Sequence, residues 1–186
     1  MSENKENFII ETLKFSLIAI LIVLPFRIFI AQPFLVSGAS MSPNFETGHY
    51  LIVDQLSYNF QNPQRGEVIV FRYPQSPKKF FIKRIIGLPN ETVILKQQEI
   101  IIKNKQNPDG FKLEEPYLKF HSNDNLEMTL SDGEYFTMGD NRPASSDSRS
   151  WGVLQEELII GRAFIRLFPF NQIELFPEYI DDFRKN

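Results

Sequence analysis

The chain has 186 residues, which is enough for one membrane segment followed by one compact domain of about 150 residues. Its formal net charge is −3, with acidic and basic residues interspersed, so we expect no nucleic-acid partner. It has no cysteine and only two histidines, which excludes disulfides and thiol catalysis and argues against a metal site.

The most apolar stretch lies near the amino terminus. Residues 15–26 (FSLIAILIVLPF) carry no charge, and extension from Phe8 to about Ile30 gives about 23 residues, enough to cross the hydrocarbon core as a helix. Lys14 and Arg27 are then placed to reach the two interfaces. A cleaved signal peptide is the alternative, but no A-x-A site follows closely. We predict a retained transmembrane anchor, with the amino terminus inside and the domain outside.

Beyond Val36 the pattern alternates, with short apolar runs separated by Gly, Pro, Asn and Asp. No later stretch has helical periodicity over ten or more positions. We predict a mostly-β domain at residues 32–186, behind a tail and anchor at residues 1–31, with a polar inserted hairpin region at about 96–132. The predicted strands are Tyr50–Asp54, Glu67–Tyr73, Phe80–Ile86, Thr92–Leu95, Glu99–Lys103, Glu134–Met138 and Gly161–Phe168.

Ser40 lies in VSGASMSP, directly behind the apolar segment. A serine in a glycine-containing loop is most often a turn residue, and a nucleophilic serine needs an activating base. His49 and His121 are the first bases to consider, but neither has a distinctive setting. We interpret both histidines as solvated surface residues.

Lys83, in KFFIKRIIGLP, is the second candidate base. Strand alternation places it on one face with Phe81 and Ile85. Apolar surroundings remove water from an ammonium and lower its pKa, so the neutral amine could accept a proton from a hydroxyl. The alternative is an edge-strand lysine that points into water and discourages aggregation.

A third polar cluster is GDNRPASSDSRSWG, at residues 139–152. It combines acidic, amide, arginine and serine side chains within fourteen residues. One interpretation is a tight turn held by Asp–Arg pairs. The other is a braced loop that orients a neighbouring catalytic side chain.

Four stretches in this order resemble the type I signal peptidase family: SGASMSPNF, RGEVIVFRYP, FIKRIIGLP and GDNRPASSDSRSWG. Members of that family are membrane-anchored Ser/Lys proteases that remove signal peptides from exported proteins. The resemblance covers about residues 28–170. It implies a signal-peptidase-like antiparallel β domain, with Ser40 as the nucleophile and Lys83 as the general base of a reaction through an acyl-enzyme.

The resemblance also implies supporting roles. Ser145 would hold the lysine amine in place, and the Ser40 backbone N–H would contribute to the oxyanion hole. Gly38 stands where many Gram-negative members carry a serine or threonine hydroxyl, so a backbone N–H is expected to replace that donor. The predicted bracing ion pairs are Arg84 with Asp140 and Asp147 with Arg149.

For the substrate, the resemblance implies exported preproteins with small residues at the first and third positions before the cut. The substrate would add as a β-strand between the strand at about 34–37 and the strand that ends at Lys83. Residues expected to shape the substrate site are Val36, Met41, Phe45 and Ile82. We expect a monomer at the lipid bilayer of a bacterial cytoplasmic membrane, single-pass, with the domain on the extracytoplasmic side and no metal or cofactor.

Two alternatives come from other interpretations of the same motifs. A self-cleaving Ser/Lys regulator of the SOS-repressor type would need a DNA-binding helix-turn-helix ahead of the β domain, where this chain has an apolar segment. A non-catalytic, membrane-tethered β-module that binds extended peptides would not need to retain all of the dyad and bracing positions.

Overall fold

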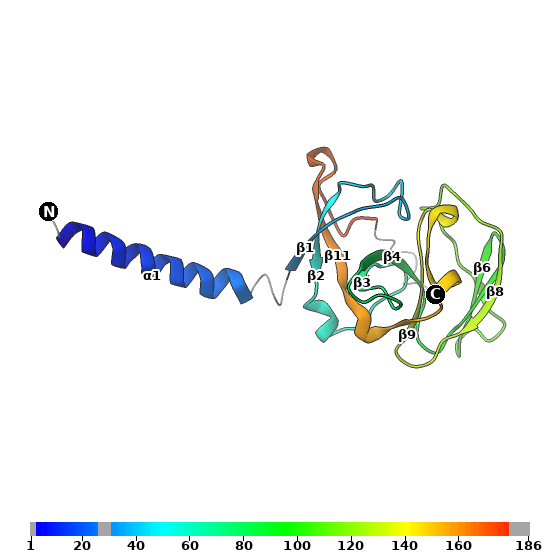
Figure 1. Cartoon of the computed structure of the whole chain (residues 1–186). Helices are drawn as coiled ribbons and strands as arrows, with labels where there is room; N and C mark the ends of the chain where they lie inside the picture. Colours follow the sequence, from blue (N-terminus) through cyan, green and yellow to red (C-terminus); the bar gives the residue numbers. More distant parts are fainter. Residues whose placement is uncertain (1–2, 26–30, 179–186) are drawn as a thin grey trace.

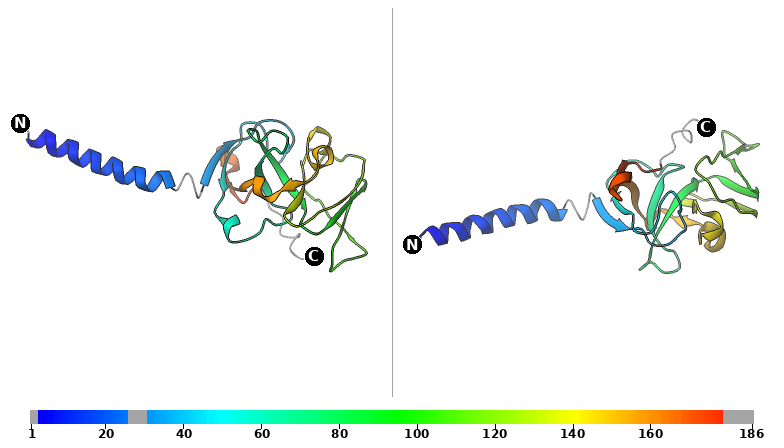
Figure 2. Two further views of the ribbon diagram at one scale, coloured as in Figure 1. Left: turned by 60° about the horizontal axis from the view of Figure 1, so that its bottom comes forward. Right: turned by 90° about the horizontal axis from the view of Figure 1, so that it is seen from above.

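The computed structural model describes residues 3–25 and 31–178 (Figure 1). Its first element, helix α1 (Glu3–Pro25), lies apart from the sheets in Figures 1 and 2, and its apolar side chains are exposed. Within the described ranges, no helix is both long and apolar enough to span a membrane. The predicted transmembrane helix is therefore not confirmed, and its expected last residues, 26–30, lie outside the described residues.

Residues 31–178 form an eight-stranded and a four-stranded sheet. The larger sheet runs β1-β2-β11-β3-β4-β9-β10, with β12 paired to β11, and its neighbouring strands are antiparallel. Its strands are β1 (Ala31–Leu35), β2 (Tyr50–Asp54), β3 (Val68–Arg72), β4 (Phe80–Gly87), β9 (Glu134–Met138), β10 (Leu154–Gln155), β11 (Ile159–Phe168) and β12 (Glu174–Leu175).

The smaller sheet has the order β7-β6-β5-β8 and lies at the end of the molecule away from α1 (Figures 1 and 2). Its strands are β5 (Thr92–Gln97), β6 (Glu99–Lys103), β7 (Phe111–Lys112) and β8 (Asp124–Thr129). The region predicted as an insertion, 96–132, falls largely within this sheet and its loops. Short helical turns elsewhere are η2 (Ser57–Asn59), η3 (Arg142–Ala144), α2 (Ser148–Trp151), η4 (Glu156–Leu158) and η5 (Phe170–Gln172).

Strands β3 and β4 form the centre of the larger sheet. The first four residues of β3, VIVF, are all buried, which explains why this strand has a continuous apolar run rather than an alternating one. On β4 the side chain of Lys83 lies opposite Ile69 of β3. A lysine at this register position is buried against the sheet and is largely shielded from water.

The predicted mostly-β, antiparallel architecture is confirmed, and each predicted strand overlaps an observed one. The sequence predicts a strand around residues 34–37, and the observed β1 begins earlier, at Ala31, and ends at Leu35. It does not predict β8, whose inward face has only two apolar side chains, Leu126 and Met128. Pairing with β5 along its whole length holds β8 in place.

Candidate active site

A cleft of about 340 Å³ opens beside the centre of the larger sheet. One wall is the end of β1 and the loop that follows it, from Phe34 to Ser40. The other wall is the first half of β4, from Phe80 to Lys83. Both residues of the predicted dyad therefore line one cleft, although they lie 43 positions apart in the sequence.

The two side chains of the predicted dyad are in direct contact. The Lys83 amine donates a hydrogen bond to the Ser40 hydroxyl, with 2.7 Å between Nζ and Oγ. It donates a second to the Ile82 carbonyl oxygen at 2.8 Å. These two acceptors fix the amine beside the hydroxyl, at a separation suited to direct proton transfer.

The Lys83 side chain is buried, with 3 % of the residue exposed. Its amine also lies 5.2 Å from the centre of the Phe81 ring, on the strand face that alternation predicts. Burial lowers the pKa of the Lys83 amine to about 8, although the nearby carboxylates of Asp147 and Asp140 favour the charged form. A substantial fraction of the amine is therefore neutral slightly above neutral pH.

The backbone of Ser40 is held by the loop at residues 139–147, called here the catalytic loop. The Asn141 N–H donates to the Ser40 carbonyl oxygen at 3.0 Å, and the Asn141 side chain donates to the Ala39 carbonyl at 3.1 Å. Gly139 packs so closely that a Cβ there would lie 2.4 Å from the Ser40 carbonyl oxygen and 2.2 Å from the Ser145 hydroxyl. Only glycine fits between these two groups.

The backbone N–H groups of Gly38 and Ser40 are the candidate donors for an oxyanion. Among the residues that the structure describes, no group accepts a hydrogen bond from the Ser40 N–H. Gly38 has a positive φ of 102°, a conformation that favours glycine, and its N–H donates to the Thr47 hydroxyl at 3.0 Å. The Ser40 N–H is thus available to a ligand, whereas the Gly38 N–H already has a partner.

The structure contains both of the predicted bracing ion pairs. Arg84 donates to both carboxylate oxygens of Asp140, at 2.9 and 2.7 Å, and the two side chains are 0 % and 1 % exposed. Arg149 likewise donates to both oxygens of Asp147, at 2.8 and 2.7 Å. The fork geometry of arginine suits both contacts, and each pair fixes an end of the catalytic loop.

Asp147 also makes hydrogen bonds with the backbone of the catalytic loop and of the residues that follow it. Its carboxylate accepts hydrogen bonds from the backbone N–H groups of Gly139 and Arg149. Among the residues that the structure describes, the buried Ser145 hydroxyl has no hydrogen-bond partner, so no hydrogen bond joins it to the lysine amine. The role of Ser145 in holding the amine stays a prediction.

The residues expected to shape the substrate site fall into two groups. Val36 and Ile82 line the cleft, as does Gly38. Met41 and Phe45 do not line it but pack in the buried core beneath, in one cluster with Val36. Their packing in this cluster supports the loop that carries Ser40.

Neither histidine contacts Ser40. His121 is exposed, as expected for a surface residue. The expectation was wrong for His49, which is buried and accepts a hydrogen bond from the Glu46 N–H through Nδ1. Burial, together with the charge of Arg166, lowers its pKa. Within the described part of the chain, no cluster of three or more His, Cys, Asp or Glu side chains could hold a metal.

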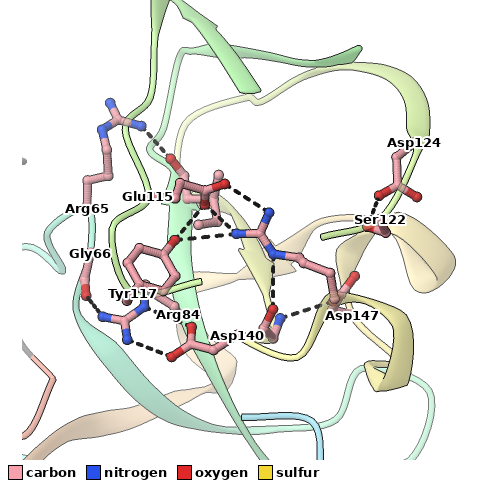
Figure 3. Close-up of polar contacts among 12 residues, drawn as sticks. Arg65, Gly66, Arg84, Glu115, Tyr117, Ser122, Asp124, Asp140 and Asp147 are labelled. Carbon is pink, nitrogen blue, oxygen red and sulfur yellow. Dashed lines mark hydrogen bonds and ion pairs between the residues drawn. The ribbon is translucent and has the colours of Figure 1, made fainter. Parts of the chain in front are cut away.

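Several residues around the dyad were not predicted from the sequence. Asn141 and Arg142 lie in the GDNR segment, where the dense polar pattern could have identified them. Asn44 contacts Asp140 at 2.8 Å from the turn behind Ser40. Glu115 and Tyr117 approach the catalytic loop from the smaller sheet, and no local pattern distinguishes them from ordinary loop residues (Figure 3).

The chain is similar in sequence to the proteins of one family. A family model described as "Signal peptidase, peptidase S26" matches residues 9–168. The chain is 38 % identical over 171 residues to "Probable signal peptidase I-1" of Synechocystis sp., covering 88 % of this chain and 84 % of that protein. It is 32 % identical over 184 residues to "Signal peptidase I" of Bacillus licheniformis, covering 92 % and 95 %.

A crystal structure of a signal peptidase I from Enterococcus faecalis aligns with 55 % of this chain and 97 % of that one, at 32 % identity and a TM-score of 0.46. The family match covers most of the chain, including the four motifs that carry the resemblance and the cleft they build. The chain therefore belongs to the signal peptidase family, a family of serine endopeptidases.

Proposed function

We propose that the chain removes signal peptides from exported preproteins, with Ser40 as the nucleophile and Lys83 as the general base. The observation that carries this proposal is the 2.7 Å contact between the Ser40 hydroxyl and a buried amine. Because burial lowers the pKa of that amine to about 8, it can accept the serine proton without a histidine.

The reaction proceeds in two halves. Neutral Lys83 takes the proton of Ser40 as Oγ attacks the scissile carbonyl carbon, and a tetrahedral oxyanion forms. As it collapses, the Lys83 ammonium protonates the leaving amine and the acyl-enzyme remains. Lys83, neutral again, then takes a proton from the attacking water, and the second tetrahedral intermediate releases the acid and restores the Ser40 hydroxyl.

The Ser40 N–H is the proposed first donor to the oxyanion. It has no acceptor within the described residues and belongs to the nucleophile itself, so it is available to donate to a bound oxyanion. Donors that are fixed before the reaction stabilise that charge more than water does in a closed site. The Asn141 and Gly139 contacts hold this segment of backbone in place.

The cleft suits an extended peptide. Its two walls are the end of β1 with its loop and the start of β4, which present backbone groups on either side of an added strand. Its floor includes the apolar side chains of Val36, Leu51 and Ile82. We propose that these side chains restrict the positions before the cut to small residues, as in the exported preproteins cut by signal peptidases.

The chain acts at a lipid bilayer in this proposal, as a monomer attached through its amino-terminal segment. The support comes from α1, whose large apolar side chains face away from any protein core, among them Phe8, Phe15 and Leu21. In a bacterium the domain would then lie outside the cytoplasmic membrane, where preproteins emerge.

Cleavage of a model preprotein in detergent tests the proposal. Ser40→Ala and Lys83→Ala should each abolish cleavage, because one removes the nucleophile and the other removes its base. The matched control is Lys79→Ala, which removes an exposed lysine next to β4 and should cleave like the wild type. Robust cleavage by either dyad variant would refute the assignment.

The alternative is a catalytically silent module that binds extended peptides in the same cleft. Labelling with a serine-directed β-lactam-like acylator separates the two functions. A catalytic Ser40 is trapped as a stable ester that mass spectrometry locates, whereas a passive binding module stays unlabelled.

A further inference from the structure

The loop between β7 and β8, residues 113–123, leaves the smaller sheet and lies against the catalytic loop (Figure 3). Phe120 forms an isolated parallel β-bridge with Asn141. Asn141 is the residue whose N–H holds the Ser40 carbonyl. The smaller sheet is therefore joined to the nucleophile through a short path of backbone contacts.

Glu115 makes a side-chain contact across this junction. Both of its carboxylate oxygens accept hydrogen bonds from the guanidinium of Arg142, one of them at 3.0 Å. The two side chains are 7 % and 5 % exposed, so both are largely shielded from water. The Tyr117 hydroxyl donates a further hydrogen bond to Glu115 at 2.5 Å.

Arg142 transmits this contact to the catalytic loop. Its Nε donates to the Gly139 carbonyl oxygen at 3.1 Å. Gly139 in turn packs against the Ser40 carbonyl oxygen, at a distance that admits no side chain. A shift of Arg142 would therefore move the backbone on which the nucleophile rests.

Tyr117 reaches the other half of the dyad. The Arg84 guanidinium lies 4.1 Å from the centre of its ring, and Arg84 is the neighbour of Lys83 on β4. The Tyr117 carbonyl oxygen accepts a hydrogen bond from Asn44 at 3.2 Å, in the turn behind Ser40. Tyr117 therefore contacts both β4, which carries Lys83, and the turn that follows Ser40.

We propose that Glu115 and Tyr117 are positioning residues, and that the smaller sheet sets the relative placement of Ser40 and Lys83. A buried ion pair contributes little stability compared with apolar side chains of similar volume, so stability alone does not account for the Glu115–Arg142 pair. Orientation does account for it, because displacement of a reacting group by about 1 Å can cost about 100-fold in rate. This inference rests on the proposed function of the dyad.

The test compares Glu115→Gln with Glu114→Gln in the full chain. Gln keeps the shape of Glu115 but removes its charge, whereas Glu114 is 81 % exposed and serves as the matched control. Active serines are counted by titration with the acylating probe, and preprotein cleavage is then expressed per titrated serine. For Glu115→Gln we expect kcat per active serine to fall about tenfold or more, with KM changed less than about twofold. The control should match the wild type.

A residue that only holds the fold would lower the number of titratable serines and leave turnover per serine unchanged. That result, or wild-type turnover per serine in Glu115→Gln, overturns the inference. If the single variant does not fold, Glu115→Leu combined with Arg142→Met replaces the pair by apolar side chains. This double variant should fold and keep the low turnover per serine, and full turnover would overturn the inference. Failure of the proposed function is distinguishable, because the wild type itself would then neither cleave nor be titrated.

Discussion

At the scale of single residues, Lys83 combines two properties that usually exclude each other. Its side chain is cationic when protonated, yet it is buried like a core residue. It lies opposite Ile69 on the neighbouring strand, and its amine lies over the Phe81 ring. The sequence places Lys83 on one strand face with Phe81 and Ile85, and only the family resemblance favours its burial. It could not exclude a solvent-facing lysine, because the same alternation is typical of edge strands whose lysines point into water.

The lowered pKa predicts the direction of the pH dependence. Below about pH 8 the Lys83 amine of the free enzyme is protonated and cannot accept the serine proton, so kcat/KM should rise about tenfold per pH unit there. Above about pH 8 this rise should level off. Initial rates of peptide cleavage between pH 5.5 and 9 measure the profile. A rate that is independent of pH across this range would contradict the assignment of Lys83 as the base.

The same burial predicts a cost in stability. The folded pKa of about 8 lies below the ordinary value of 10.5, so the folded state disfavours the proton that the unfolded chain keeps. Lys83→Met should therefore raise the free energy of unfolding at pH 7 by an amount on the order of 2 kcal/mol. The gain over the wild type should shrink as the pH rises from about 8 to about 10.5. Urea unfolding of both proteins at several pH values measures this difference, and a gain that grows with pH would contradict the prediction.

At the scale of elements, the charged residues of the catalytic loop can be predicted from the sequence, whereas their contacts with distant strands cannot. The GDNR segment and the nearby Asp147 and Arg149 could be identified because dense charge in a short loop must be paired to be buried. Their partners from distant strands were expected only through family resemblance. Glu115 could not be identified, because its contact depends on how one sheet packs against another.

Gly139 gives a prediction that belongs to this loop. Gly139→Ala places a Cβ against the Ser40 carbonyl and the Ser145 hydroxyl, so the loop must move away from the nucleophile. We expect cleavage to fall at least about tenfold in a protein that still folds. Pro143→Ala, at an exposed position of the same loop, should keep the wild-type rate. Preprotein cleavage together with near-UV circular dichroism checks both variants, and an active Gly139→Ala enzyme would contradict this packing.

The buried pair between β4 and the catalytic loop predicts a large effect on stability. Asp140→Asn leaves the Arg84 guanidinium buried without its counter-charge, which should lower the free energy of unfolding by about 3–5 kcal/mol. Glu99→Gln removes the exposed contact with Lys112 and should cost less than about 0.5 kcal/mol. Equilibrium unfolding in urea compares the two, and equal losses would argue against a structural role for the Arg84–Asp140 pair.

At the scale of the whole molecule, the cleft, the catalytic loop and the smaller sheet form a continuous arrangement, whereas α1 lies apart with its apolar side chains exposed (Figure 1). The sequence pattern predicted an apolar amino-terminal segment followed by a mostly-β domain, and the β architecture is confirmed. It did not predict the division into two sheets, since β7 and β8 are short or polar and depend on their neighbours for pairing. Long-range pairing of this kind leaves little local signal.

The proposed attachment to a bilayer predicts the behaviour of α1 variants. Leu17→Glu combined with Leu21→Glu introduces two charges among exposed apolar side chains, so the chain should move from the membrane pellet to the supernatant. Cleavage of a soluble peptide should stay unchanged, because α1 does not line the cleft. Fractionation at high pH followed by an activity assay tests this expectation. Retention of the variant in the pellet would contradict attachment through α1.

The central claim is that burial makes the Lys83 amine a base for Ser40. Isotope-detected NMR of the lysine side chains, with Lys83→Ala used for assignment, measures the pKa of this amine directly in the folded protein. The account predicts a single lysine that titrates near pH 8, well below the others, and that is lost in the variant. A Lys83 signal that titrates near 10.5 with the remaining lysines would contradict it.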